Sequence, residues 1–331
     1  MGHKLRTGLI IKSQSGFYTI LTDEGEQIVA RIRGRLKKER QDITIVAVGD
    51  QVKWQTLSDG SHVIEGVEER TRALTRLKPL ASGRGSRRWD RQGYLREKEQ
   101  IIIANPDQVV FVIACANPDP RLKMLDRLLV GAERQEIPIL ICANKVDLVG
   151  LEKAKRLFHI YEWISYEVIY TSATNGHGID TLREHLQNKI SALVGPSGVG
   201  KTSLLNALEP DLGKRVMSVS HVTGKGRHTT TVAEMTPLAA GGWVADTPGI
   251  RALALFDLEP EEIDAYFPDI APYVPDCAFS DCSHTVEPGC NVRQALENDE
   301  IDEHRYESYI RLHQEYRKLA DMYWWGIEED Y

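Results

Sequence analysis

The sequence predicts a multidomain protein, with an N-terminal β-barrel of the OB-fold type, a central α/β domain and a small C-terminal α-helical domain. Three observations predict this order. Short β-type runs broken by turn residues fill residues 1–75, apolar runs alternate with amphipathic segments over residues 101–255, and cysteines cluster late in residues 256–331. A chain of 331 residues is long enough for two or three separate cores.

The bulk composition is that of a water-soluble globular chain. Hydrophobic residues make up 42% and charged residues 27% of the sequence. No apolar run approaches the roughly 20 residues that a membrane span needs, and the first residues lack a signal-peptide pattern. We therefore expect a cytoplasmic protein with no membrane partner.

The charge is distributed unevenly along the chain. The net charge of −7 is the sum of +7 over residues 1–100, zero over residues 101–250 and −14 over residues 251–331. A basic end and an acidic end predict two surfaces with different partners.

The N-terminal barrel is predicted from six β-type runs: TGLIIKS, FYTILT, QIVARIR, ITIVAV, DQVKWQTL and HVIEGVEE. The alternation around Val29 and Ile32 places Arg31, Arg33 and Arg35 on the solvent side, and a basic loop with Lys37, Lys38 and Arg40 follows. This basic surface fits an OB-fold that binds oligonucleotides. A solvated charged loop is the alternative.

Residues 76–100 are predicted to form an Arg-rich linker. Trp89 and Tyr94 are interleaved with arginines at positions 84, 87, 88, 91 and 96. This composition suits RNA, because arginines meet phosphates and flat rings stack on bases. A flexible tether whose aromatic side chains pack on a neighbouring domain is an equally good interpretation.

Residues 101–255 show the alternation of a doubly wound parallel sheet. Continuous apolar runs predict buried strands at 109–116, 137–145, 167–173 and 190–195. Amphipathic segments predict helices at 121–135, 151–164 and 179–189 and from 201 to 208. Cys115 and Cys142 fall within the apolar runs and are expected to be buried thiols.

A phosphate-binding loop follows the strand at 190–195. The motif G-x-x-x-x-G-K-[ST] is matched in full by Gly195, Pro196, Ser197, Gly198, Val199, Gly200, Lys201 and Thr202. Glycines let backbone N–H groups point at a phosphate. Lys201 supplies a charge to the β- and γ-phosphate oxygens, and the Thr202 hydroxyl is a Mg²⁺ ligand. An incidental glycine turn is the alternative.

The choice of base is predicted from Asn144, Lys145, Val146 and Asp147 at the end of the preceding strand. The Asp147 carboxylate can accept hydrogen bonds from the ring N–H and amine of guanine, whereas adenine would leave it unpaired. Ser172 and Ala173, at the end of the next strand, suit contact with the guanine carbonyl. We therefore expect GTP and GDP as ligands. The base motif precedes the phosphate loop, which is the reverse of the usual order.

The switch residues are predicted between the phosphate loop and residue 250. Asp246 and Gly249 fit the motif D-x-x-G, with Asp246 holding Mg²⁺ through water and the Gly249 N–H sensing the γ-phosphate. Of the threonines at 229–231, Thr230 is favoured as the Mg²⁺ ligand. Ile250 cannot orient a water molecule, so His228 is the candidate for placing it. A contact with a partner is the alternative role of His228.

A zinc site is predicted in the C-terminal domain. Cys277, Cys282, His284 and Cys290 have the spacing C-x4-C-x-H-x5-C, which supplies four ligands and leaves no open position. Without a secretory signal, disulfide pairing is disfavoured. We expect one structural Zn²⁺ that holds together a loop too small to build a core.

Taken in order, these motifs resemble the circularly permuted small-ribosomal-subunit GTPase family (the RsgA/YjeQ type), and the resemblance covers nearly the whole chain. It implies late maturation of the 30S subunit, contact with 16S rRNA and GTP hydrolysis stimulated by the ribosome. It also implies nucleotide contacts from Asn144 to Asp147 and from Gly195 to Ser203, a catalytic role for Lys201, Thr230 and His228, and a monomer.

Two other functions are open at this point. One is a GTP-gated module that binds RNA or protein with little turnover of its own. The other is a P-loop ATPase or kinase, against which the base motif argues. The permuted order also suggests that the γ-phosphate state at Asp246–Gly249 pulls on the zinc domain that follows.

Overall fold

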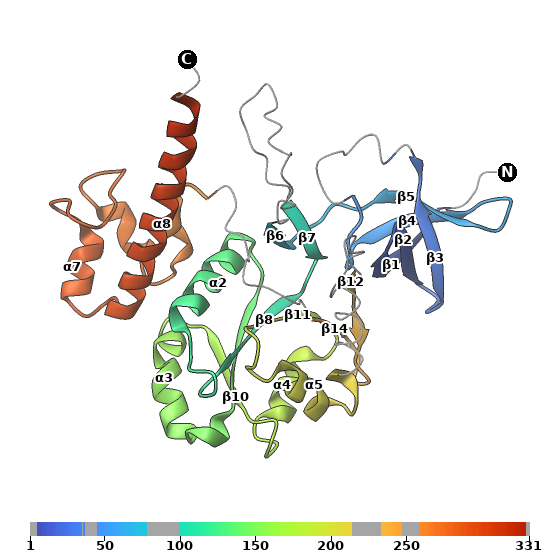
Figure 1. The fold of residues 1–331 in the computed structure, drawn as a ribbon, viewed down its shortest axis with the longest axis horizontal. Coiled ribbons are helices and arrows are strands. Elements are labelled where there is room, and N and C mark those ends of the chain that lie inside the picture. Colours follow the sequence, from blue (N-terminus) through green and yellow to red (C-terminus); the bar gives the residue numbers. More distant parts are fainter. Residues whose placement is uncertain are drawn as a thin grey trace.

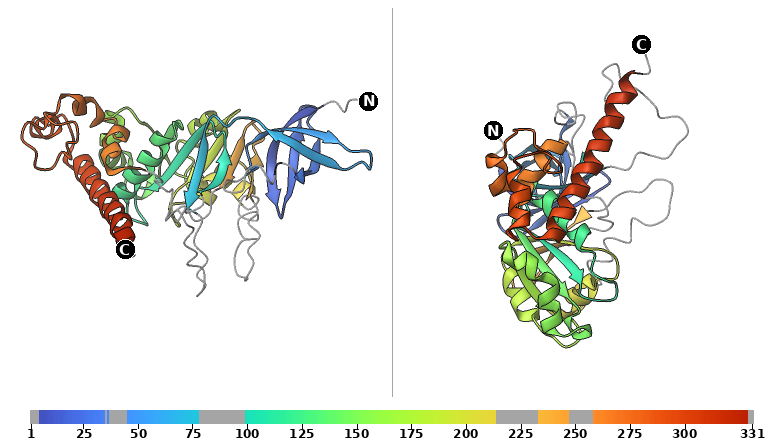
Figure 2. Two further views of the ribbon diagram at one scale, coloured as in Figure 1. Left: turned by 90° about the horizontal axis from the view of Figure 1, so that it is seen from above. Right: turned by 90° about the vertical axis from the view of Figure 1, so that its left-hand side faces the viewer.

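The computed structural model describes residues 5–34, 36, 45–77, 99–213, 233–246 and 258–328. The α/β domain lies in the middle, with the barrel on one side and the helical domain on the other (Figures 1 and 2). Among the described residues, no helix combines the length and the apolar character that a membrane crossing requires. The predicted order of three units is confirmed.

Five short strands close the N-terminal barrel: β1 (Arg6–Gln14), β2 (Phe17–Thr22), β3 (Gln27–Ile32), β4 (Gln51–Thr56) and β5 (His62–Val67). They pair in the order β1-β2-β3-β5-β4, and β1 pairs with β4 to complete the ring. The β3–β5 pair is parallel. Ile10, Ile20, Ile64 and Trp54 point inward and are at most 2% exposed. This confirms the OB-fold.

The predicted strand ITIVAV is not a strand in its described part, residues 45–48. Val46 and Val48 are buried there as their hydrophobicity requires. The backbone is held by the fully buried Asp50 carboxylate, which accepts the Ala47 N–H at 2.7 Å and an Arg70 N–H at 2.7 Å. A buried carboxylate therefore satisfies polar groups that a ladder would otherwise pair.

The outer face of β2 and β3 is partly apolar. Arg31 and Arg33 are exposed, as expected, and Val29 shares their face because alternate strand residues point the same way. Phe17 is 42% and Val29 56% exposed. The Arg31 guanidinium lies 4.4 Å from the centre of the Phe17 ring. Arg35, Lys37, Lys38 and Arg40 lie outside the described residues.

A two-stranded ribbon connects the barrel to the α/β domain. Its strands β6 (Ala73–Leu77) and β7 (Glu99–Ala104) pair antiparallel on either side of the Arg-rich stretch, so the chain returns to its starting point. The Ala104 N–H donates to the Val48 carbonyl at 2.8 Å. Gly49 has φ +90°, and a Cβ there would lie 2.0 Å from the Ala104 oxygen, so only glycine fits. Trp89 and Tyr94 lie outside the described residues.

The central sheet has the order β10-β9-β8-β11-β14-β13. Its strands are β8 (Gln108–Ala114), β9 (Ile139–Asn144), β10 (Glu167–Thr171), β11 (Ile190–Val194), β13 (Thr236–Pro237) and β14 (Trp243–Asp246). All neighbours are parallel except β13–β14. The doubly wound sheet is thus confirmed, with one antiparallel edge strand.

Helices cover both faces of this sheet. Those of the described residues are α2 (Leu122–Arg134), the short 3-10 turn η1 (Val146–Leu148), α3 (Leu151–Trp163), α4 (Ile179–Leu186) and α5 (Lys201–Leu208). One buried cluster joins α2 and α3 to one face, and another joins α4 and α5 to the opposite face. Cys115 and Cys142 are at most 3% exposed, as expected.

The C-terminal domain consists of η2 (Pro260–Tyr266), η3 (Ala271–Asp276), α7 (Asn291–Glu297) and α8 (Glu303–Glu328). The segment that holds α7 and α8 is therefore not one continuous helix. Asn298 ends α7, Asp299 has φ +59°, and the Asp302 carboxylate accepts the His304 N–H at 2.8 Å where α8 begins. Short polar side chains favour such breaks because they bond to nearby backbone.

A buried ion network docks this domain on α2. Asp126 and Arg305 are both fully buried, and Arg305 Nη1 lies 2.7 Å from Asp126 Oδ1. Arg305 also binds Asp269 with two hydrogen bonds of 2.8 and 3.1 Å. Tyr161 and Ser308 donate to the same Asp126 carboxylate. Each of these charges makes at least two hydrogen bonds, which is what makes its burial tolerable.

Candidate nucleotide and zinc sites

The loop from Gly195 to Thr202 connects β11 to α5, as the motif predicts. Gly198 and Gly200 have φ of +85° and +97°, and a Cβ on Gly200 would lie 2.5 Å from Asn144 Nδ2. Lys201 Nζ donates to the Gly195 carbonyl at 2.6 Å and the Pro196 carbonyl at 3.2 Å. The ammonium group thus lies across the loop at the start of a helix, where an anion is favoured.

The base motif is bonded directly to this loop, although about 50 residues separate them in sequence. Asn144 is 1% exposed, and its Nδ2 donates to the Val199 carbonyl at 2.8 Å. Lys145 has φ +64°, and its Nζ donates to the Gly198 carbonyl at 2.7 Å and to the Asn117 carbonyl. The two predicted motifs therefore form a single site at the carboxyl ends of β9 and β11.

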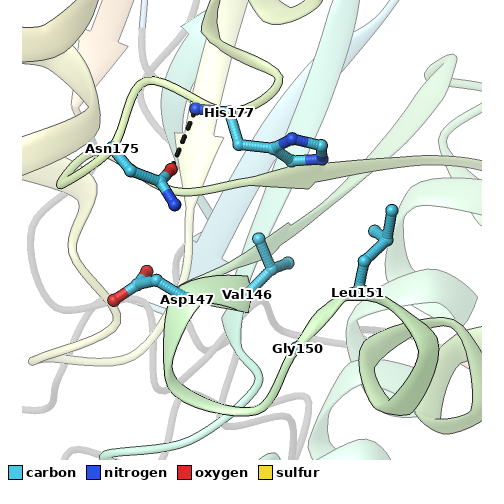
Figure 3. Close-up of a pocket in the computed structure, with 6 residues that line it drawn as sticks. All are labelled: Val146, Asp147, Gly150, Leu151, Asn175 and His177. Atoms are coloured by element: carbon cyan, nitrogen blue, oxygen red, sulfur yellow. Dashed lines mark hydrogen bonds between the residues drawn. The ribbon is translucent and has the colours of Figure 1, made fainter.

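The Asp147 carboxylate is held in place from the end of β10. The Ser172 hydroxyl donates to Asp147 Oδ1 at 2.6 Å. Beside it is a cavity of about 190 Å³ lined by Val146, Asp147, Gly150, Leu151, Asn175 and His177. In Figure 3, Asn175 and His177 lie across this hollow from Asp147 and Val146, and the His177 N–H donates to Asn175 Oδ1 at 3.1 Å.

Three of the other predicted nucleotide residues, Ala173, Ser203 and Asp246, lie in the described part of the chain. Ala173 packs against the sheet and Ser203 is exposed in the first turn of α5. The backbone of Asp246 ends β14 opposite Leu193 of β11, so it reaches the same sheet edge as the phosphate loop. His228, Thr230, Gly249 and Ile250 lie outside the described residues.

The four predicted zinc ligands come together in the C-terminal domain. Their ligand atoms all lie within 4.8 Å of one another, although Cys277 and Cys290 are 13 positions apart. His284 Nδ1 lies 3.6 Å from Cys277 Sγ and 3.4 Å from Cys290 Sγ. A tetrahedral zinc with bonds of about 2.3 Å to sulfur and about 2.0 Å to nitrogen would separate these atoms by about 3.5 Å. The cluster therefore fits the ion.

The thiol chemistry of the cluster favours a cation. Burial and the neighbouring thiols raise the pKa of Cys282 to about 12. A bound Zn²⁺ would reverse this shift, because a thiol that coordinates the ion is held as the thiolate.

Second-sphere groups fix the orientation of His284. Its Nε2 lies 3.1 Å from Asp264 Oδ2, which leaves Nδ1 for the cluster. The Tyr306 hydroxyl donates to the His284 carbonyl at 2.6 Å. His284 has φ +60°, an unusual value that a surrounding turn must stabilise. The Glu287 carboxylate supplies that turn, because it accepts the N–H groups of Ser283, Thr285 and Val286 at 3.0–3.1 Å.

Sequence reasoning missed Asn117, Asp264 and Glu287. Asn117 follows the strand β8 in an Asn-Pro dipeptide, a turn signal that could have placed it at the same sheet edge. No sequence signal pairs Asp264 with His284, because 20 residues and two turns separate them.

Two family models match this chain. The model of the RsgA GTPase family matches residues 88–256, and that of the RsgA N-terminal domain matches residues 7–64. A small ribosomal subunit biogenesis GTPase RsgA from Gemmatimonas aurantiaca is 42% identical over 93% of this chain and 97% of its own. Its counterpart from Thermotoga maritima is 39% identical over 93% of this chain and 95% of its own.

Two solved structures are similar to the whole chain. The crystal structure of YjeQ from Thermotoga maritima has a TM-score of 0.74 at 36% identity, covering 95% of this chain and 99% of that one. The crystal structure of YloQ, described as a circularly permuted GTPase, has a TM-score of 0.70 at 30% identity and covers 96% of each chain.

Proposed function

The chain belongs to the RsgA family of circularly permuted GTPases, and we propose that it binds the 30S ribosomal subunit and assists a late step of that subunit's maturation. In this proposal the ribosome stimulates GTP hydrolysis, and hydrolysis times the release of the protein. The observation that supports it is the pair of hydrogen bonds from Asn144 and Lys145 to the phosphate loop, which hold the permuted base and phosphate motifs together at one edge of the sheet.

The proposed nucleotide contacts follow from this geometry. Backbone N–H groups from Gly195 to Ser203 would surround the phosphates, with Lys201 as the charge beside them. Asp147 would accept from the guanine edge, with Ser172 and Ala173 on the carbonyl side. Thr202, Thr230 and Asp246 would hold Mg²⁺, which supplies charge neutralisation at the β- and γ-phosphates.

The proposed catalytic group is His228. Ras-type GTPases orient the attacking water with a glutamine, but this chain has Ile250 after the D-x-x-G motif, so His228 would orient the water instead. We expect His228→Ala to slow single-turnover hydrolysis at least tenfold while GTP affinity stays unchanged, since general acid–base groups contribute on the order of 10²–10⁴-fold. His159→Ala, which removes an exposed imidazole from α3, is the matched control. Equal rates for His228→Ala and the unmodified protein would remove His228 from the mechanism.

The barrel is the proposed contact with 16S rRNA. Strands 2 and 3 form the oligonucleotide-binding face of OB-folds. Here that face carries the exposed Phe17 ring with Arg31 stacked 4.4 Å from its centre. A flat ring and a guanidinium suit an unstacked base and its phosphate. One structural Zn²⁺, held by Cys277, Cys282, His284 and Cys290, completes the proposal.

The test is the single-turnover GTPase rate measured alone and with 30S subunits, 50S subunits or free rRNA. We expect acceleration by 30S subunits well above that by the other two. Equal rates in all four samples would overturn the proposal.

A second candidate is a GTP-gated binding module with little turnover, and Ile250 favours it because it lacks a hydrogen-bonding group. Nucleotide-dependent binding to 30S subunits without faster hydrolysis would establish that function instead. A monomer in the cytoplasm is the expected state in both cases.

A further inference from the structure

The short strand β12 (Ala233–Glu234) adds to the edge of the barrel strand β1. Lys12 lies opposite Glu234, and Ser13 opposite Ala233, in antiparallel register. The Met235 N–H donates to the Ile11 carbonyl at 2.9 Å. Figure 1 shows β12 between the barrel and β14. A segment of the GTPase domain has therefore become part of the barrel's sheet.

Side chains reinforce this joint. Lys12 Nζ lies 2.7 Å from Glu234 Oε2, and both side chains are about one-third exposed. Met235 is 2% exposed and belongs to the same buried cluster as Ile10 and Ile11. The joint thus combines one partly exposed ion pair, a short ladder and one buried side chain, which is a small interface.

The edge of β1 is divided between two partners. Arg6 to Leu9 pair with β4 and close the barrel, and the register of β1 against β2 then shifts between Ile10 and Lys12. Lys12 and Ser13 pair with β12 instead. Without β12 this half of the edge would present unpaired N–H and C=O groups. The barrel therefore has a prepared acceptor for one added strand.

The position of β12 in the chain connects this joint to the nucleotide. Thr231, the last residue of the threonine run that carries the predicted switch, precedes Ala233 by two positions. After Met235 the chain forms β13 and then β14, which ends at Asp246 of D-x-x-G. The joint thus lies between the two motifs that contact the γ-phosphate in GTPases.

The zinc domain has no comparable link within the described residues. It docks on α2, and that helix carries none of the nucleotide motifs. Its interface contains Asp126 and Arg305, both fully buried, so separating it would leave charges unpaired. The interface with α2 is therefore suited to holding the zinc domain in one position, whereas the β12 joint is suited to two states, paired and unpaired.

We propose that β12 is a strand-addition joint that couples the nucleotide state of the GTPase site to the barrel. The β12–β1 ladder has different stability in the GTP and GDP states, and a ligand on the barrel changes GTP turnover through it, because coupling between two sites is reciprocal. The claim that a ligand on the barrel changes GTP turnover rests on the proposed function. The claim that the ladder responds to the bound nucleotide, which is the nucleotide side of the proposal, rests only on the GTPase activity.

Hydrogen exchange of the full-length protein tests the nucleotide side without RNA. Exchange is compared between GDP and a non-hydrolysable GTP analogue in peptides covering residues 8–14 and 233–237, with residues 303–313 of α8 as reference. We expect a severalfold change in exchange at the Met235 amide and none in α8. Unchanged exchange at both joint peptides, or a larger change in α8, would overturn the proposal.

Charge reversal tests the coupling itself. Lys12→Glu and Glu234→Lys each place like charges opposite one another, and the double swap restores the pair. We expect each single variant to lower 30S stimulation by about two- to fivefold, as a partly exposed pair allows, and the swap to recover it. Lys53→Glu, on the exposed Lys53–Glu68 pair of the same barrel, is the matched control.

The outcomes separate the two proposals. Full stimulation in both single variants, or an equal loss in Lys53→Glu, would contradict the joint. If 30S subunits do not stimulate the unmodified protein, the proposed function fails, and the exchange measurement still decides whether β12 responds to nucleotide.

Discussion

At the residue scale, the base site depends on one carboxylate and the groups that hold it. Asp147 follows Lys145, whose left-handed backbone turns the chain at the end of β9. The Ser172 hydroxyl occupies one of its oxygens at 2.6 Å. In the proposed function the other lone pairs of the carboxylate meet the two donors on the guanine edge, so the choice of base would rest on a charge in a fixed orientation.

Asp147→Asn should therefore change the preferred base from guanine to xanthine. The amide would lose the charged hydrogen bond to guanine, which is worth about 1.5–3 kcal/mol, and would gain a donor for the xanthine carbonyl. We expect GTP affinity to fall by about 10- to 100-fold and affinity for xanthosine triphosphate to rise, as measured by equilibrium competition.

Ser172→Ala is the control for this substitution, because it removes the hydroxyl that orients Asp147 and keeps the charge. It should weaken GTP binding less and retain the guanine preference. An unchanged preference in Asp147→Asn would refute the role of the carboxylate.

At the element scale, the loop of the candidate zinc site has little core of its own. The loop from Cys277 to Cys290 contains no regular helix or strand and exposes Phe279 and Val286. Its order comes from the ligand cluster, the Glu287 turn and the contact of His284 with Asp264. A loop of this kind should lose its structure together with its metal.

Asp264→Asn should lower zinc affinity by about 10- to 100-fold, because second-sphere carboxylates orient and polarise the ligating imidazole. Cys282→Ser or chelation should lower the melting temperature of the C-terminal domain more strongly. Zinc release to a chromogenic chelator and melting followed by circular dichroism measure the two effects. Asp281→Asn changes an exposed carboxylate beside Cys282 and is the control. Zinc retention equal in all variants would argue against the site.

At the scale of the whole molecule, the chain permutation changes the connections and leaves the sheet intact. Strands β8, β9 and β10 are made before β11, yet they lie beside it in an order that serves a single nucleotide site. The domain is then held to its neighbours by unlike contacts. A buried ion network fixes the zinc domain on α2, whereas a ribbon and a two-residue strand join the barrel.

Arg305→Leu should destabilise the interface between the zinc domain and α2 by about 3–5 kcal/mol, because Asp126 and Asp269 would remain buried without their partner. Arg317 is on the same helix as Arg305, is exposed, and lies 3.8 Å from Glu261 of η2. Arg317→Ala should therefore cost at most about 1 kcal/mol. Urea unfolding followed by a C-terminal probe compares them. Equal losses would mean that the network contributes no more than a surface pair.

Much of the fold was predictable because its signals are local. Apolar runs located β8 to β11 within a few residues, and amphipathic periods located α2 and α3. These local patterns gave wrong or incomplete predictions where contacts between distant residues determine the backbone conformation. Val46 and Val48 are buried without a ladder, and two side chains meet the backbone there: the Asp50 carboxylate accepts the Ala47 N–H and Arg70 donates to the Ile45 carbonyl. The sequence predicts a helical C-terminal domain, but the break between α7 and α8 depends on Asp302, whose carboxylate begins a new helix after Asp299.

The sequence by itself determined the order of the motifs, and it predicted the chemistry of the base and phosphate groups and four candidate metal ligands. These follow from residue types at short spacings, which backbone geometry converts directly into local shape. Only the tertiary structure decided that Asn144 and Lys145 bond to the phosphate loop, that Asp264 orients His284 and that β12 joins the barrel. Such contacts join residues 20 to more than 200 positions apart, and packing, which no local pattern encodes, brings them together.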